Sequence, residues 1–152
     1  MNRFERGCRG MVWALSASAA LAGPTGALAQ SGELVAVVAA NSKAPPKLSA
    51  DELGAIFMGT AKSFPNGERA VPIDQKSGTR PYASFYQLSS GKTEAQIKAY
   101  WARILFTGKG QPPQDGGDSA AVKKLVAANP NMVGYIEPAL VDGSVRVITE
   151  LK

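Results

Sequence analysis

Residues 70–85 read AVPIDQKSGTRPYASF, and this stretch indicates the class of fold. Its first part, AVPID at 70–74, is a short apolar segment suited to a strand. The polar turn KSGT comes next, and Tyr82 and Phe85 then stand three positions apart, as on one face of a helix. A strand that passes through a turn into a helix is the unit from which α/β proteins are built. We therefore predict a strand, a turn and a helix here.

The flanking sequence continues this alternation. LVAVVAA at 34–40 is an uninterrupted apolar run, typical of a strand buried on both faces. Two more strands are expected at 132–136 and 145–148. Further helices are predicted to begin after Ser49, Thr93 and Asp118. Strands separated by helices predict an α/β fold with a mixed, mostly parallel sheet flanked by helices.

Two of these helices have capping boxes in the sequence. Ser49 is followed three residues later by Glu52, and Thr93 by Gln96, the spacing at which each side chain caps the other residue's backbone amide. The helix after Thr93 then carries the clearest amphipathic stripe of the chain. Its apolar positions are Ile97, Tyr100, Trp101, Ile104 and Leu105. We expect Trp101 to belong to the core, and residues 108–117 to form a polar loop.

The N-terminus has the pattern of a secretory signal peptide. Three arginines lie among the first nine residues, residues 11–23 are apolar, and Ala27-Leu28-Ala29 is a small-x-small cleavage site. We expect residues 1–29 to be removed, which leaves a single domain at 30–152 without cysteine. The apolar run is shorter than the ~20 residues of a membrane-spanning helix. The mature protein is expected to be periplasmic or secreted, with no membrane insertion.

Composition excludes several classes of function. The 152 residues include 17 basic and 12 acidic side chains, a net charge of +5, and no histidine. Without histidine the commonest general base and zinc ligand are missing, so Ser-His-Asp and Cys-His nucleophile systems are excluded. A modest charge without a long basic run argues against nucleic-acid binding. We expect no metal and no cofactor.

The best candidate binding site is the turn Ser77-Gly78-Thr79-Arg80 at the start of a helix. Backbone N–H groups at a helix N-terminus attract anions, and Gly78 lets a ligand approach the backbone closely. Ser77 and Thr79 add hydroxyl donors, and Arg80 adds a fixed positive charge that can form two bonds to a phosphate or carboxylate. An ordinary helix cap followed by a surface arginine is the alternative interpretation.

Two carboxylates could support a different function. Asp74 and Glu137 each follow a predicted strand, and together they could serve as an acid–base pair if both faced one cleft. Nothing in the sequence places them within reach of each other, and we expect Asp74 to cap the turn that follows it. We therefore expect no catalytic residues and no enzymatic activity.

Several stretches together resemble one known family. They are the opening strand LVAVVAAN, the segments LSADELGAIFMGTAKSFPNG and AVPIDQKSGTRPYASF, and the segments YWARILFTGKGQPP and NPNMVGYIE. On these the chain resembles the substrate-binding proteins of phosphate ABC transporters. The resemblance implies a type 2 periplasmic-binding-protein fold reduced to a single lobe, and an oxyanion held by Ser77, Gly78 and Thr79. The family's ligand arginine commonly lies four residues before the serine, where this chain has Ile73, so Arg80 would supply the charge.

The sequence thus predicts an exported solute-binding-like protein that takes phosphate or another small oxyanion. The alternative is a protein–protein interaction or sensor module of the cell envelope, with a vestigial anion site. Under either hypothesis the partner could be an ABC transporter, an envelope sensor or a second copy of the chain.

Overall fold

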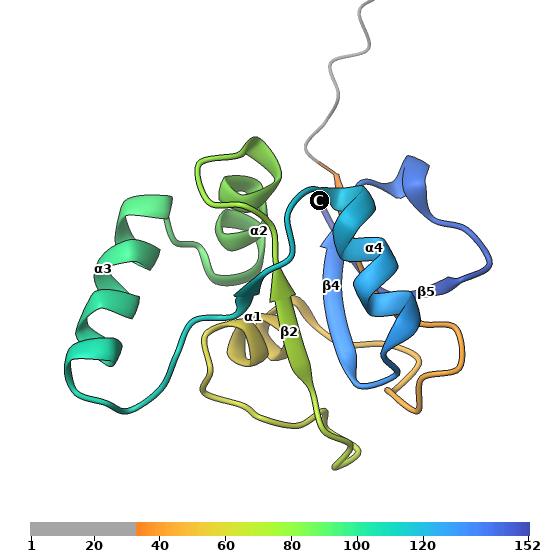
Figure 1. Ribbon diagram of the computed structural model, residues 1–152, viewed down its shortest axis with the longest axis horizontal. Coiled ribbons are helices and arrows are strands. Elements are labelled where there is room, and N and C mark those ends of the chain that lie inside the picture. The colour runs from red at the N-terminus through yellow and green to blue at the C-terminus, as the bar shows by residue number, and fades with distance from the viewer. Residues whose placement is uncertain (1–32) are drawn as a thin grey trace, which may run out of the picture.

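The computed structural model describes residues 33–152, which form a five-stranded sheet with helices on both faces (Figure 1). The predicted signal peptide lies outside the described residues. The strands are β1 (Leu34–Ala39), β2 (Val71–Asp74), β3 (Gln114–Asp115), β4 (Met132–Ile136) and β5 (Val145–Leu151). The helices are α1 (Ala50–Phe57), α2 (Arg80–Ser90), α3 (Glu94–Phe106), α4 (Ser119–Ala128) and the short 3-10 helix η1 (Pro138–Leu140).

The sheet is mixed, and its strand order is β3-β2-β4-β1-β5. β2 pairs in parallel with both β3 and β4, whereas β1 pairs antiparallel with both β4 and β5. The predicted α/β fold with a mixed sheet flanked by helices is confirmed. Parallel pairs do not predominate, however, because β1 lies between β4 and β5 and runs against both. Helical crossovers account for the parallel half of the sheet, but no such connection sets the direction of β1.

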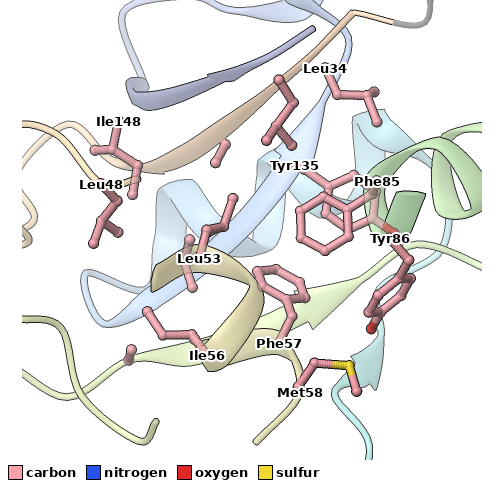
Figure 2. Packing of buried hydrophobic residues seen from close by; sticks show 14 of the residues in the cluster. Leu34, Leu48, Leu53, Ile56, Phe57, Met58, Phe85, Tyr86, Tyr135 and Ile148 are labelled. Atoms are coloured by element: carbon pink, nitrogen blue, oxygen red, sulfur yellow. The ribbon is translucent and has the colours of Figure 1, made fainter. Parts of the chain in front are cut away.

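β1 is the centre of the core, and all six of its residues are buried, as predicted. Successive side chains of a strand point to opposite faces. Ala36 and Val38 therefore belong to a large cluster with α1, α2 and α3, shown in part in Figure 2. Val35 and Val37 belong to a smaller cluster on the other face, under α4. Burial on both faces explains the uninterrupted apolar run in the sequence.

Aromatic rings fill the larger cluster (Figure 2). Phe85 of α2 stacks on Tyr135 of β4 with ring centroids 3.9 Å apart and planes 6° apart. Phe57 of α1 packs against Phe85 at 4.5 Å. The rings thus join two helices to the middle of the sheet, and Tyr82 and Phe85 are both buried, as the sequence predicted.

Local hydrogen bonds begin three of the helices as predicted. The Ser49 hydroxyl accepts a hydrogen bond from the Glu52 amide at 3.2 Å, and the Ser49 amide donates to the Glu52 carboxylate at 2.8 Å. Thr93 and Gln96 form the same reciprocal pair at α3. Asp118 caps α4 by accepting from the Ala121 amide at 2.8 Å.

One part of the predicted α3 stripe is wrong. Ile97 and Trp101 are buried, but Leu105 is 51% exposed and the following Phe106 is 94% exposed. α3 lies at the side of the molecule, apart from the sheet and away from α4 (Figure 1). Ile104 is still partly buried against the core, but the last two residues of the helix are not. The polar loop at 108–117 also contains the two-residue edge strand β3.

Gly54 allows α1 and α2 to approach each other closely. A Cβ atom at Gly54 would lie 2.6 Å from the backbone oxygen of Ser89 in α2. Because a backbone atom cannot rotate away, Gly54→Ala should separate the helices and destabilise the protein by about 2 kcal/mol, measured by urea unfolding. The control is Gly143→Ala, whose Cβ would meet nothing within 4 Å. A more stable Gly54→Ala variant, as helix propensity alone would produce, would contradict this packing.

Candidate functional site

The parallel strands β3, β2 and β4 end at one edge of the sheet, which we call the carboxyl edge. In α/β sheets this edge is where ligands usually bind, because the strand-to-helix loops gather there. A cavity of about 550 Å³ lies at this edge, between the turn before α2, the start of α4 and the segment after β4. Its lining includes Lys76, Thr79, Asp118, Ser119 and Glu137.

The predicted turn is a left-handed glycine turn that leads into α2. Gly78 has a φ of +83°, and a Cβ there would meet nothing within 4 Å, so the backbone is open to an approaching ligand. Ser77, Gly78 and Arg80 are exposed, whereas Thr79 is half-buried and lines the cavity. The structure thus places all four predicted residues on one turn, with one of them in the cavity wall.

The N-terminus of α2 differs from those of α1, α3 and α4 in having no side-chain cap. Thr79 occupies the N-cap position, but its hydroxyl donates to the Lys76 carbonyl at 2.7 Å and accepts no hydrogen bond from the first turn of the helix. Pro81 carries no N–H in that turn. The positive end of the α2 dipole is therefore not neutralised by a capping side chain.

Charges of both signs surround the cavity. Lys76 lines it, and its backbone amide donates to the Gly117 carbonyl at 3.0 Å, which joins the α2 turn to the α4 turn. Glu137 lines it as well, and the Oε2 atom of Glu137 is buried without a hydrogen-bond partner among the described residues. The site therefore combines the positive charge of Lys76 and the uncapped N-terminus of α2 with one carboxylate oxygen, of Glu137, that accepts no hydrogen bond.

Asp74 is turned into the protein, which corrects the expectation that it caps the turn. Its carboxylate accepts hydrogen bonds from the Tyr135 hydroxyl, from the Tyr86 hydroxyl at 2.6 Å and from the Gln75 amide at 3.0 Å. Burial raises the pKa of Asp74 from 3.8 to about 6, and the hydrogen bonds from the two tyrosines only partly offset this. Asp74 does not line the cavity that contains Glu137, so the two carboxylates are not brought together in one cleft.

Gln75 is a structural support that sequence reasoning missed. Its buried side-chain amide donates to the Ser119 hydroxyl at 2.7 Å and to the Tyr135 carbonyl at 2.9 Å. It therefore ties the turn before α2 to α4 and β4, so that the turn is held by buried, satisfied hydrogen bonds. The only signal in the sequence is a polar residue directly after a strand, which does not specify a partner.

Two further findings concern metals and membranes. Within residues 33–152, no group of three or more His, Cys, Asp or Glu side chains is arranged to hold a metal ion. In the same range, no helix has the length and apolarity needed to cross a bilayer.

The sequence matches no family model, and no curated protein resembles it significantly. Solved structures do resemble it. One is a Clostridium perfringens protein described as a candidate phosphate ABC transporter substrate-binding protein, with bound phosphate, at a TM-score of 0.61 and 19% identity. Others are an ABC-type phosphate transport receptor from Vibrio cholerae (TM-score 0.58, 19% identity) and PstS from Borrelia burgdorferi (TM-score 0.55, 16% identity).

The similarity concerns the fold of one part of those proteins. Each match covers 76% of this chain but only 44%, 45% and 46% of the respective structure. The chain therefore spans less than half the length of the structures it matches. Its α/β fold is that of half of a phosphate-binding-protein structure.

Proposed function

We propose that this chain is an exported, non-enzymatic binding protein that holds phosphate or another small oxyanion at Ser77, Gly78, Thr79 and Arg80. The observation that carries the proposal is the uncapped N-terminus of α2, which lies behind an open glycine turn at the carboxyl edge. The other three α-helices of the described chain have a side-chain cap.

The physical basis is the electrostatics of a helix end. Backbone amides and the helix dipole favour an anion at the start of α2. The Ser77 hydroxyl can donate to an anion oxygen, and the Thr79 hydroxyl can do so when it gives up its bond to the Lys76 carbonyl. The Arg80 guanidinium can bind two anion oxygens at once. Lys76 adds a positive charge in the neighbouring cavity wall. A resemblance in fold to a structure with bound phosphate supports this choice of ligand.

The affinity should be low, because the site is open on one side. Within residues 33–152, Ser77, Gly78 and Arg80 are exposed, and nothing described covers the turn from the other side. Water then competes for the oxygens of the ligand and screens the Arg80 charge. A few exposed donors correspond to a dissociation constant of about 1 mM, or about −4 kcal/mol.

Titration of residues 30–152 with phosphate, sulfate and a dicarboxylate at low salt tests the proposal, with binding followed by NMR shifts. Phosphate should bind near 1 mM and shift the amides of residues 77–80 and of Tyr82. Arg80→Ala should weaken binding by about tenfold, through loss of a charge-assisted contact, and Thr79→Val should weaken it as well. Arg69→Ala, which removes the same charge away from the turn, is the matched control and should leave the affinity unchanged.

The other outcomes discriminate between the alternatives. Tight binding that survives both substitutions would place the ligand elsewhere. No binding of any anion at tens of millimolar would refute the oxyanion site and favour an interaction or sensor module with a vestigial site. Tighter phosphate binding by a dimer than by the monomer would show that a second copy of the chain supplies the other lobe.

A further inference from the structure

A second concave surface lies away from the carboxyl edge. It has a volume of about 510 Å³ and is formed by the end of α1, the hairpin at 62–70, α3 and the loop at 109–114. Its lining is largely apolar and includes Met58, Tyr100, Trp101, Ile104 and Pro112. We call it the α1–α3 groove. It shares no lining residue with the carboxyl-edge cavity.

The charges of the α1–α3 groove all have one sign. Lys62, Arg69 and Lys109 line it, and no carboxylate does. Within residues 33–152, none of these three cations forms an ion pair. Lys98, Lys123 and Lys152, which do form ion pairs, do not line the groove. Unneutralised charges of one sign in a low-dielectric hollow attract an anionic partner more strongly than isolated surface charges do.

The end of α3, beside the groove, exposes two large apolar side chains. Ile104 lines the groove, and the next two residues, Leu105 and Phe106, are 51% and 94% exposed. α3 stands at the outer side of the molecule (Figure 1), and its last two residues remain exposed. A small molecule seated in the groove could not cover these side chains as well, so they indicate a larger partner.

We propose that the α1–α3 groove docks an acidic segment of a partner protein, which inserts at least one large apolar side chain between the cations. The partner's carboxylates pair with Lys62, Arg69 and Lys109, and its apolar side chain packs on Tyr100 and Ile104. A flat lipid surface would reach Phe106 but not the concave floor. A second copy that presented the same face would bring like charges together.

The test uses ¹⁵N-labelled residues 30–152 and three synthetic twelve-residue peptides. The first alternates Glu with Leu and Phe, the second replaces every Glu with Lys, and the third replaces every Leu and Phe with Ser. The first should bind with a dissociation constant of about 100 µM, weaken as salt is added, and shift the amides of Tyr100, Ile104 and Lys109. The other two peptides should bind at least tenfold more weakly.

Charge reversal locates the contact. Lys62→Glu combined with Lys109→Glu should weaken binding of the acidic peptide by at least tenfold. Both lysines are exposed, so the fold should be retained. Lys109→Glu alone should weaken binding as well. Lys124→Glu on α4 is the matched control for this single reversal, because it makes the same charge change under the opposite face of the sheet and should leave binding unchanged. Phe106→Ser should also weaken binding, which tests the apolar extension.

Several results would overturn the proposal. These are equal binding of the acidic and basic peptides, shifts outside the groove, and an affinity unaffected by the paired charge reversal. Binding to phosphatidylglycerol vesicles without binding to the acidic peptide would also overturn it, in favour of a lipid surface. Thr79→Val should bind the peptide like the unmodified protein, so failure of the oxyanion site and failure of the groove are distinguishable.

Discussion

Replacing Trp101 with alanine should lower the free energy of unfolding by about 3–5 kcal/mol. Trp101 is 7% exposed, and its ring lies over Gly59, where an added Cβ would be 3.1 Å from the indole. Trp101 and Ile97 are the buried residues of α3, so Trp101 provides much of the contact between this helix and the rest of the protein. The loss is a large share of the ~5–15 kcal/mol that stabilises a domain, and it can be measured by urea unfolding.

Phe106→Ala is the matched control for this prediction. It removes a large aromatic side chain from the same helix, but Phe106 is 94% exposed, so the change should be within about 0.5 kcal/mol. A loss below about 1 kcal/mol for Trp101→Ala would mean that α3 does not depend on this residue for its attachment. Trp101 would then be better explained as a binding residue of the α1–α3 groove.

The Asp74 carboxyl should make the free energy of unfolding depend on pH. Burial raises the pKa of this carboxyl from 3.8 to about 6, so the folded protein holds the proton more tightly than the unfolded chain. The stability contributed by Asp74 is therefore fully present below about pH 4 and is lost as pH rises to about 6. The difference in pKa corresponds to about 3 kcal/mol. The chain has no histidine, so no imidazole titrates in this range.

Asp74→Asn cannot ionise, and the difference in stability between the two proteins isolates this carboxyl. Urea unfolding at intervals from pH 4 to 7 should show wild type losing about 3 kcal/mol relative to Asp74→Asn, with the change centred between pH 4 and 6. Tyr86→Phe should move this window to higher pH, because it removes a hydrogen bond that favours the carboxylate. Parallel profiles for wild type and Asp74→Asn would contradict the assignment.

The mixed charges at the carboxyl edge limit what the proposed oxyanion site could hold. Asp118 and Glu137 line the same cavity as Lys76, so an anion must sit nearer to the α2 turn than to these carboxylates. By contrast, the lining of the α1–α3 groove has only positive charges. The two surfaces therefore differ in charge, which is why we propose a small oxyanion for one and an extended acidic segment for the other.

The elements of this fold could be predicted from the sequence because their signals are local. Ser49 with Glu52 and Thr93 with Gln96 cap helices through bonds that span three residues, and both pairs are confirmed. The apolar run at 34–40 specified a strand buried on both faces, since neither set of alternating side chains is polar. The turn at Ser77–Arg80 was likewise found from its glycine and the helix behind it, and its anion-binding role remains a prediction.

Tertiary structure alone decided the features that depend on distant segments. The direction of β1 follows from its insertion between β4 and β5, whose residues lie about a hundred positions away in the sequence. Leu105 continues the apolar period of α3, yet it is exposed because no distant segment packs on that side of the helix end, whereas the neighbouring Ile104 still contacts the core. Asp74 is buried because Tyr86 and Tyr135, from two other elements, provide donors for its carboxylate. Periodicity and capping act within a few residues, whereas burial and pKa depend on which segments pack together in space.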